Sequence, residues 1–349
     1  MGKVYRVAQW ATGNVGSRAL RHVIEHPGME LVAVWVSNPA KVGKDAGELA
    51  GTGATGVKAV GTIDEVLAAK PDAVLYMPHV FRLEEVCRFL ESGVNVVSTR
   101  MELQNPRALD PAMADLLEAA CRKGGTSVHA TGSSPGFITE AMPIVMASIQ
   151  RRMDSFRIDE FADCSSRNSP EMIFEMMGFG AQPGNGNQGH RDHAKYSFAP
   201  SLQLVATALG MPIDEWTVEG AQGLARADVH IAAGVVPKGT VAATRTTLTG
   251  WHQGRKLMQF CSTWFVSTDV DTSDGEEWEF RTPSGWHVVM MGDCPLDVSI
   301  SYPCKPEDYA DMTPGLTANR PVNALPFVCE AAPGIVTTVD LPQVIARLG

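Results

Sequence analysis

A short apolar run at the start of this chain leads into a glycine-containing turn and then into a helix. The run Val4–Trp10 precedes the turn, and apolar residues recur at helical spacing over 14–25. The turn consists of Ala11, Thr12, Gly13, Asn14, Val15 and Gly16. This is the pattern G-x-G-x-x-G with alanine in its first place. We therefore expect a strand, a tight turn and a helix in direct succession.

Such a turn suits a phosphate-bearing ligand. Gly13 lets the backbone approach a pyrophosphate, and Gly16 lets the helix pack close to the strand. The N-terminus of the helix offers free N–H groups and the positive end of its dipole. A second strand at 31–36 completes the context and predicts dinucleotide binding. The alternative is a helix start that merely requires small residues.

The first 140 residues go on alternating between strands and helices. We expect strands at 31–36, 73–77, 94–98 and 126–130, and helices at 62–70, 83–91 and 110–123. Thr62 and Glu65 have the spacing of a capping box at the start of the first of these helices. Alternation of this kind predicts a parallel sheet with right-handed crossovers, as in a Rossmann domain.

The pattern changes after Gly136. We expect helices at 140–151, 171–178 and 201–209, and a glycine-rich loop at 181–189. Residues 216–300 are rich in strands, and we place them at 229–233, 240–249, 258–266, 277–281 and 286–291. This predicts a second, α+β domain built on a mostly antiparallel sheet. The expected boundaries are 1–138 for the dinucleotide-binding domain, 139–318 for the substrate domain, and 319–349 for a segment with a helix near 322–330 that returns to the first domain.

Charge and composition exclude several classes of protein. A net charge of −10 disfavours nucleic acid as a partner, because phosphate backbones repel an acidic chain. The chain shows no secretory signal and no apolar run long enough to span a bilayer, so we expect a cytoplasmic protein that does not bind membranes. Seven cysteines without a Cys-x-x-Cys pair predict free thiols and no metal site.

The end of the second strand bears on the choice of cofactor. NAD-preferring sites usually carry a carboxylate about 20 residues beyond the glycines. Here the segment includes Ser37, Asn38 and Lys41, and no carboxylate appears before Asp45. Hydrogen bonds from Ser37 and Asn38 and the charge of Lys41 suit a 2′-phosphate. The segment favours NADP(H), with NAD(H) tolerated; the alternative makes Lys41 a solvated loop residue.

Ligands of open α/β sheets bind beyond the carboxyl ends of the strands. Pro78 and His79 follow the fourth strand, Glu102 follows the fifth, and Ser134 and Pro135 follow the sixth. Glu102 is our candidate catalytic residue, since a carboxylate there can hold ammonium or activate water for attack on an iminium. A helix-capping or salt-bridged glutamate is the alternative. His79 could contact the cofactor or act as an acid, although most single histidines are structural.

Two groups in the second domain also bear on the substrate. His190 and His193 could line the substrate side of the site, or belong to a polar surface segment. Met172, Met176 and Met177 could shape an adaptable apolar pocket, although methionine at helical spacing is more often plain core.

Four segments together resemble a known group of enzymes. They are VAQWATGNVG at 7–16, SNPAKVGKDAGEL at 37–49, GSSPGF at 132–137 and APGIVTTVDLP at 332–342. The chain resembles the dihydrodipicolinate-reductase-like group, and most closely the 2,4-diaminopentanoate dehydrogenases and native amine dehydrogenases. The His-His-x-x-Lys signature of true dihydrodipicolinate reductases and the Glu-Lys-Pro signature of sugar dehydrogenases are both missing.

The resemblance implies an NAD(P)-dependent homodimer that interconverts a small amine with a ketone or aldehyde plus ammonia, its second domain serving substrate binding and dimerisation. It places Glu102 at the catalytic carboxylate and the nicotinamide near Thr99 and the turn of Ser134, Pro135 and Gly136. Asn323 matches a segment that returns to the cofactor. Two other functions stay open, a carbonyl or cyclic-imine reductase that needs no ammonia and an NADP(H)-binding sensor without turnover.

Overall fold

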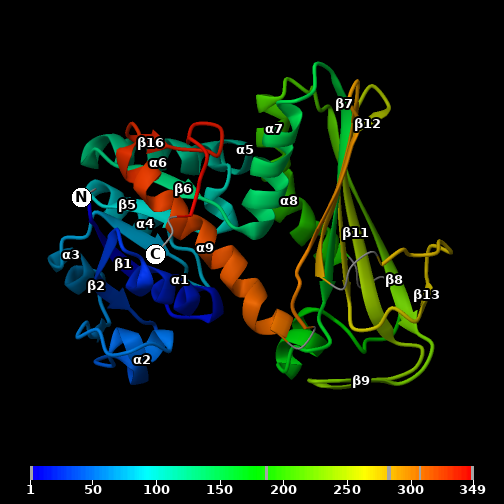
Figure 1. The fold of residues 1–349 in the computed structure, drawn as a ribbon, viewed down its shortest axis with the longest axis horizontal. Coiled ribbons are helices and arrows are strands. Elements are labelled where there is room, and N and C mark those ends of the chain that lie inside the picture. Colours follow the sequence, from blue (N-terminus) through cyan, green and yellow to red (C-terminus); the bar gives the residue numbers. More distant parts are fainter. Residues whose placement is uncertain (1–2, 185–187, 281–283, 306–307, 347–349) are drawn as a thin grey trace. The chain divides into compact units, whose positions relative to one another are not determined.

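The structure divides into two compact units. The computed structural model describes residues 3–184, 188–280, 284–305 and 308–346. One unit comprises Met1–Phe137 and Thr313–Gly349, and the other comprises Ile138–Met312. Figure 1 shows the chain as a ribbon with most of its helices and strands labelled. No helix among the described residues is long and apolar enough to cross a membrane.

A seven-stranded sheet forms the centre of the first unit. Its order is β16-β6-β5-β4-β1-β2-β3, and every pair of neighbours is parallel. The strands are β1 (Tyr5–Trp10), β2 (Met29–Trp35), β3 (Ala59–Val60), β4 (Ala73–Tyr76), β5 (Asn95–Ser98), β6 (Ser127–Ala130) and β16 (Gly334–Ile335). This arrangement confirms the predicted parallel, Rossmann-type sheet.

Helices cover both faces of this sheet. They are α1 (Asn14–Glu25), α2 (Ala46–Ala50), α3 (Ile63–Ala68), α4 (Leu83–Glu91), α5 (Pro106–Leu109), α6 (Pro111–Gly124) and the part of α9 (Tyr309–Glu330) that belongs to this unit. The capping box of Thr62 and Glu65 is present at the start of α3. Asp110 caps α6 by accepting hydrogen bonds from two backbone N–H groups.

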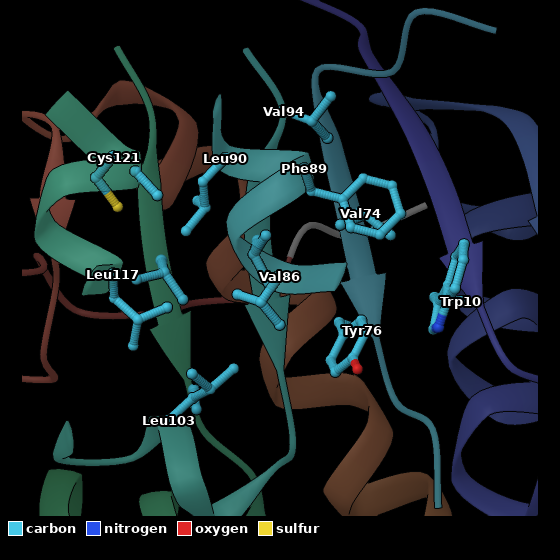
Figure 2. Close-up of a cluster of buried hydrophobic side chains, with 14 of the residues drawn as sticks. Trp10, Val74, Tyr76, Val86, Phe89, Leu90, Val94, Leu103, Leu117 and Cys121 are labelled. Atoms are coloured by element: carbon cyan, nitrogen blue, oxygen red, sulfur yellow. The ribbon is translucent and has the colours of Figure 1, made fainter. Parts of the chain in front are cut away.

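The central strand β4 is buried on both faces, and the face toward α4 and α6 carries Val74 and Tyr76. Figure 2 shows Val86 and Phe89 of α4 directed toward Val74 and Tyr76 of β4. The ring of Trp10 lies edge-on to Phe89, with 5.1 Å between centroids. Burial of each such large side chain stabilises the fold by about 1.5–3 kcal/mol.

The opposite face of the sheet packs against α1 and α9. Ala318, Val322 and Leu325 of α9 are fully buried in the same cluster as Tyr5 and Val7 of β1. The observed α9 is much longer than the helix expected near 322–330, although it contains three prolines. Its apolar residues recur at helical spacing, and we attribute the continuation of the helix to their burial, which offsets the backbone hydrogen bonds that proline cannot make.

His129 of β6 connects the sheet to the chain beyond β16. It is buried, and its Nδ1 donates to the backbone oxygen of Val336 over 2.8 Å. Burial lowers the pKa of His129 to about 4, so the ring is neutral in the folded protein near pH 7.

A stability–pH prediction follows for His129. The unfolded chain binds a proton at this residue below about pH 6.5, whereas the folded chain resists protonation until about pH 4. His129 therefore lowers the free energy of unfolding as the pH falls through this window. We expect the melting temperature of His129→Asn to fall less than that of the wild type between these two pH values. Equal falls in both proteins would contradict the prediction.

The second unit is built on another seven-stranded sheet. Its order is β13-β8-β11-β12-β7-β14-β15. The strands are β7 (Met153–Asp163), β8 (Glu215–Ala225), β11 (Val241–His252), β12 (Arg255–Phe265), β13 (Val270–Thr272), β14 (Ser284–Gly292) and β15 (Leu296–Ser301), with a separate hairpin of β9 (Val229–Ile231) and β10 (Gly234–Val236). Only β7 and β12 pair in parallel among the described pairs, which confirms a mostly antiparallel sheet.

The helices of this unit differ from those expected. A helical turn at Glu171–Met176 and α7 (Met142–Ala147) are shorter than predicted, and α8 (Gln188–Ala208) is longer. The helix expected at 201–209 begins earlier, at Gln188, and continues through Pro200. Of the loop expected at 181–189, residues 181–184 form no helix or strand, residues 188 and 189 belong to α8, and residues 185–187 are not described. Phe198, before the proline, stacks on Phe260 of β12 with 4.2 Å between ring centroids. This packing accounts for the continuation of the helix on the N-terminal side of Pro200, which proline by itself disfavours.

The prediction of a strand at 277–281 is wrong for the described residues, 277–280, which form no regular structure. The indole N–H of Trp278 donates to the carboxylate of Asp274, and the guanidinium of Arg245 lies 4.3 Å from its ring centroid. Trp278 is thus held by a neighbouring turn and by a side chain of β11 rather than by strand pairing. The individual strands β8 and β15 had no counterpart in the prediction.

Candidate active site

The glycine turn follows β1 as predicted, and its two glycines are needed for different reasons. A Cβ atom on Gly16 would lie 2.3 Å from the backbone oxygen of Ala11, so the close packing of α1 excludes any side chain there. A Cβ atom on Gly13 would meet no atom of the described residues within 4 Å. Gly13 therefore faces open space at the N-terminus of α1, where a phosphate group can approach the backbone.

Ala11 occupies the first place of the pattern, and its φ of 77° lies in the left-handed region that glycine adopts easily. Gln9 supports this turn from within the sheet. Its side chain is fully buried, and its Nε2 donates to the backbone oxygen of Ala11 over 2.9 Å. Gln9 was not predicted from the sequence, although a polar residue within an apolar strand was a signal for it.

Lys41 lies against the glycine turn. Its Nζ is 3.3 Å from both the backbone oxygen and the Oγ1 of Thr12. Ser37 and Asn38 are exposed at the end of β2, and the Asn38 Oδ1 accepts from the backbone N–H of Ala40. The sequence-predicted residues beyond β2 and the turn beyond β1 thus lie together, with one cation and exposed hydrogen-bonding groups between them.

Glu102 lies in a short 3-10 helix, Met101–Leu103, just beyond β5. Both of its carboxylate oxygens accept from the guanidinium of Arg100, one of them from Nε over 3.0 Å. The side chain of Glu102 is 15% exposed. Arg100 also donates to the backbone oxygen of His79 over 2.9 Å, so it joins the loop after β5 to the loop after β4. This role of Arg100 was not predicted from the sequence.

The other predicted residues of these loops have less specific surroundings. Thr99 is partly buried, directly after β5. Pro78 is partly buried and the side chain of His79 is exposed, and the described contact of His79 in this loop is made by its backbone oxygen. His79 thus contributes a backbone acceptor that holds Arg100.

The loop after β6 is held by α9 within the same unit. The Nε of Arg320 donates to the Oγ1 of Thr131 over 2.9 Å, and the hydroxyls of Ser133 and Thr317 are 2.7 Å apart. Gly136 has a φ of 125°, and a Cβ atom there would lie 2.6 Å from the Thr131 hydroxyl. These contacts fix the loop that contains Ser134 and Pro135.

Two buried polar atoms close to these contacts have no partner among the described residues. They are the Oγ of Ser134 and the Oδ1 of Asn323, which lies on α9 just beyond Arg320. Buried polar atoms are normally hydrogen-bonded, and an orphaned one calls for an explanation such as a missing ligand. Both residues were predicted to contact the cofactor, and their free acceptors fit a ligand that carries amide N–H groups.

The second unit contains a cavity of about 490 Å³. Met172, Met176 and Met177 line it, together with residues of α8, β11 and β12. The three methionines therefore border a pocket, which was the first of the two interpretations of their spacing. The side chains of His190 and His193 lie outside the described part of the chain. No cluster of three or more metal-binding side chains occurs among the residues that are described.

Comparison with known proteins identifies the family. Residues 10–99 match the model for the N-terminus of dihydrodipicolinate reductase, and residues 137–349 match the 2,4-diaminopentanoate dehydrogenase C-terminal domain. An amine dehydrogenase of Streptomyces virginiae is 30% identical, over 97% of both chains. The chain belongs to the amine dehydrogenase family. This membership confirms the expected enzyme class, an NAD(P)-dependent oxidoreductase that acts on CH–NH₂ donors.

Other members of the amine dehydrogenase family are more distant. The 2,4-diaminopentanoate dehydrogenase of Acetoanaerobium sticklandii is 23% identical, over 83% of this chain and 79% of its own length. A solved structure of an amine dehydrogenase from Mycobacterium smegmatis covers 98% of this chain and 97% of its own, with a TM-score of 0.77 and 21% identity. That structural likeness confirms the fold over the whole chain.

Proposed function

We propose that this protein interconverts a small amine with a ketone or aldehyde plus ammonia, using NADP(H). The observation that carries the proposal is the placement of Glu102 and the glycine turn in one unit. Glu102 follows β5 and the turn follows β1, and only β4 separates these strands in the parallel sheet. Because the carboxyl ends of parallel strands share one edge, both features belong to the same ligand-binding edge.

Several residues at this edge would hold the cofactor. The turn from Ala11 to Gly16 would bind its pyrophosphate, and Lys41 with Ser37 and Asn38 would bind a 2′-phosphate. Asn323 and Ser134, whose oxygens are buried without described partners, would bind the amide of the nicotinamide. When bound, the nicotinamide supplies or accepts the hydride.

Glu102 would bind and orient the nitrogen. A carboxylate has about four acceptor positions, and Arg100 uses one on each oxygen. The remaining positions can accept from ammonia, from an iminium N–H or from water. In the reductive direction, one carbonyl compound, one ammonia, one NADPH and one proton give one amine, one NADP⁺ and one water. Glu102 would assist the loss of that water and hold the iminium for hydride transfer.

Lys41 leads to a prediction about cofactor choice. Removing a charge-assisted hydrogen bond costs about 1.5–3 kcal/mol, or about 10- to 100-fold in affinity. We expect Lys41→Ala to raise the Kd of NADPH by this factor and to change that of NADH little, as measured by fluorescence titration. Lys44→Ala is the matched control, because Lys44 pairs with Glu48. Equal loss of affinity for both cofactors would contradict the assignment of Lys41 to the 2′-phosphate.

The direct test of function is NADPH oxidation in the presence of a panel of small ketones and aldehydes, with and without high ammonium. Oxidation that requires ammonium supports the proposal. Oxidation that is equally fast without ammonium makes the protein a carbonyl or imine reductase and removes the role of Glu102. Tight cofactor binding without any turnover on the panel would favour the sensor function.

A further inference from the structure

Gln9 is a polar residue in the centre of the buried parallel sheet. It lies in β1 between Val34 of β2 and Leu75 of β4, and it is fully buried. Because side chains alternate along a strand, Gln9 points to the same face as Tyr5 and Val7, which belong to the cluster with α1 and α9. The side chains of this face are mainly apolar. An apolar residue is therefore expected at this position, and the glutamine calls for a specific reason.

The amide of Gln9 reaches the turn that follows its own strand. Its Nε2 lies 2.9 Å from the backbone oxygen of Ala11 and 3.5 Å from that of Trp10. Carbonyl oxygens only accept hydrogen bonds, so the NH₂ group of the amide must face them. The same nitrogen lies 3.2 Å from the position that a Cβ atom on Gly16 would occupy. The amide of Gln9 thus lies between the end of β1 and the first turn of α1.

Ala11 is the residue that this amide holds in place. Its φ of 77° lies in the left-handed region, which is less favourable for alanine than for glycine. The backbone N–H of Ala11 donates to the oxygen of Trp35 in β2 over 3.0 Å, and the backbone oxygen of Ala11 accepts from Gln9. Ala11 is therefore fixed on both sides. It cannot relax to a more favourable φ without breaking one of these hydrogen bonds.

Gln9 supports the turn without a comparable benefit to the sheet. Its Oε1 is buried and has no hydrogen-bond partner among the described residues. A buried acceptor without a partner is unfavourable, and an apolar side chain of similar length would avoid this penalty. Departures of this kind from the local rules of stability are typical of functional sites. The benefit of the glutamine therefore lies in the conformation of the turn.

We propose that Gln9 is a positioning residue for cofactor binding. Its amide holds the carbonyl of Ala11 so that the backbone N–H groups of the glycine turn are arranged for a pyrophosphate before the cofactor binds. A glycine in the first place of the pattern would adopt this conformation without support, whereas alanine requires it. Donors that are arranged in advance bind more tightly, because binding does not have to order them. This inference rests on the proposed NADP(H)-dependent function and adds the residue that shapes its phosphate site.

The substitution Gln9→Met removes the amide and keeps the length of the side chain. If only a fraction of the molecules has the binding conformation, the Kd rises by the inverse of that fraction. We expect the Kd of NADPH in fluorescence titration to rise about 5- to 30-fold, the combined effect of one hydrogen bond and the left-handed conformation that it supports. The Kd of NADH should rise by the same factor, because both cofactors carry the pyrophosphate. The melting temperature should stay within about 4 °C of that of the wild type, since the unpaired oxygen is lost together with the hydrogen bond.

A second substitution separates positioning of the turn from general support of the sheet. Glycine at position 11 reaches the left-handed region without help from an amide. We therefore expect Ala11→Gly to recover most of the lost NADPH affinity when it is combined with Gln9→Met, and to change the Kd little in the wild-type background. The two substitutions should be strongly non-additive, as expected for residues in direct contact. A general weakening of the sheet would not be repaired at position 11.

Ser127→Ala is the matched control. Ser127 is 1% exposed at the start of β6, and its Oγ donates to the backbone oxygen of Ala332 over 3.0 Å. The control thus removes a buried hydrogen bond between a side chain and the backbone from the same sheet, at the edge opposite to the turn, and its Kd for NADPH should equal that of the wild type.

Three results would overturn the role of Gln9 and leave the proposed function in place. They are an unchanged Kd in Gln9→Met, a raised Kd that Ala11→Gly does not lower, and a melting temperature far below the expected range, which would make Gln9 a structural residue of the sheet. A wild type that binds neither NADPH nor NADH would overturn the proposed function and the role of Gln9 together.

Discussion

Glu102→Gln is expected to abolish most turnover while leaving cofactor binding intact. Glutamine preserves the size of the side chain but loses the charge that would bind ammonium and accept its protons. Loss of a positioned acid–base group typically costs 10²–10⁴-fold in rate, so we expect kcat to fall by about that factor. The Kd of NADPH should change little, because the expected phosphate-binding residues lie on the glycine turn and on the loop after β2.

Steady-state NADPH oxidation at saturating substrate measures kcat of Glu102→Gln, and fluorescence titration measures its Kd for NADPH. Glu91→Gln is the matched control, because Glu91 also forms an ion pair, with Lys123, but lies at the end of α4. Its kcat should equal that of the wild type. Full activity in Glu102→Gln would leave Glu102 as the structural partner of Arg100 alone, and the catalytic group would have to be sought elsewhere.

Alanine at the two glycines of the turn is expected to affect different properties. Gly16→Ala should lower the melting temperature, and Gly13→Ala should weaken NADPH binding. In Gly16→Ala the new Cβ would overlap the backbone oxygen of Ala11, which cannot move without displacing the turn. Overpacking of this kind costs about 1–3 kcal/mol, which is about 2–4 °C in melting temperature per kcal/mol for a unit of this size. In Gly13→Ala the new Cβ points into open space, and the loss at a helix N-cap is at most about 1 kcal/mol.

NADPH affinity should be affected more strongly by Gly13→Ala than the stability of the fold is. Its Cβ would occupy the space through which the phosphate approaches, and the lost hydrogen bonds would raise the Kd of NADPH about 10- to 100-fold. Thermal unfolding and titration of both variants separate the two effects. A Gly13→Ala protein that binds NADPH as tightly as the wild type would argue against the turn as the pyrophosphate site.

Sequence patterns predicted the local elements of the first unit well. The bounds of α1 and α4 agree with the predicted helices, because each has an apolar face at helical spacing and an unambiguous end. The two-residue strand β16 was not predicted, since its pairing with β6 depends on residues about 200 positions away in sequence. In the second unit, β8 was missed because its half-exposed, mixed side chains lack a clear alternation, whereas β15 was missed although Leu296–Ser301 alternates strictly between apolar and polar residues.

In the candidate site, too, continuous segments were predicted and pairings between distant residues were not. The glycine turn and the loop after β2 could be recognised because each is a continuous segment whose residue types suit a phosphate group. The fork of Arg100 on Glu102, the buried Gln9 and the contact of Arg320 with Thr131 were not. Each of these depends on a side-chain direction or on a pairing between distant segments, which periodicity does not encode. Lys41 was singled out as a partner of a 2′-phosphate, and its contact with Thr12 of the turn was not predicted.

The division of the first unit between residues 1–137 and 313–349 has a consequence for synthesis. When the ribosome has made the first 137 residues, α1 can already cover part of this face of the sheet, but the part that packs against Ala318, Val322 and Leu325 of α9 is still uncovered. The whole second unit must be translated before the missing helix emerges. Because incomplete domains expose apolar surface that promotes aggregation, the nascent first unit is open to aggregation for longer than a contiguous domain of the same size would be.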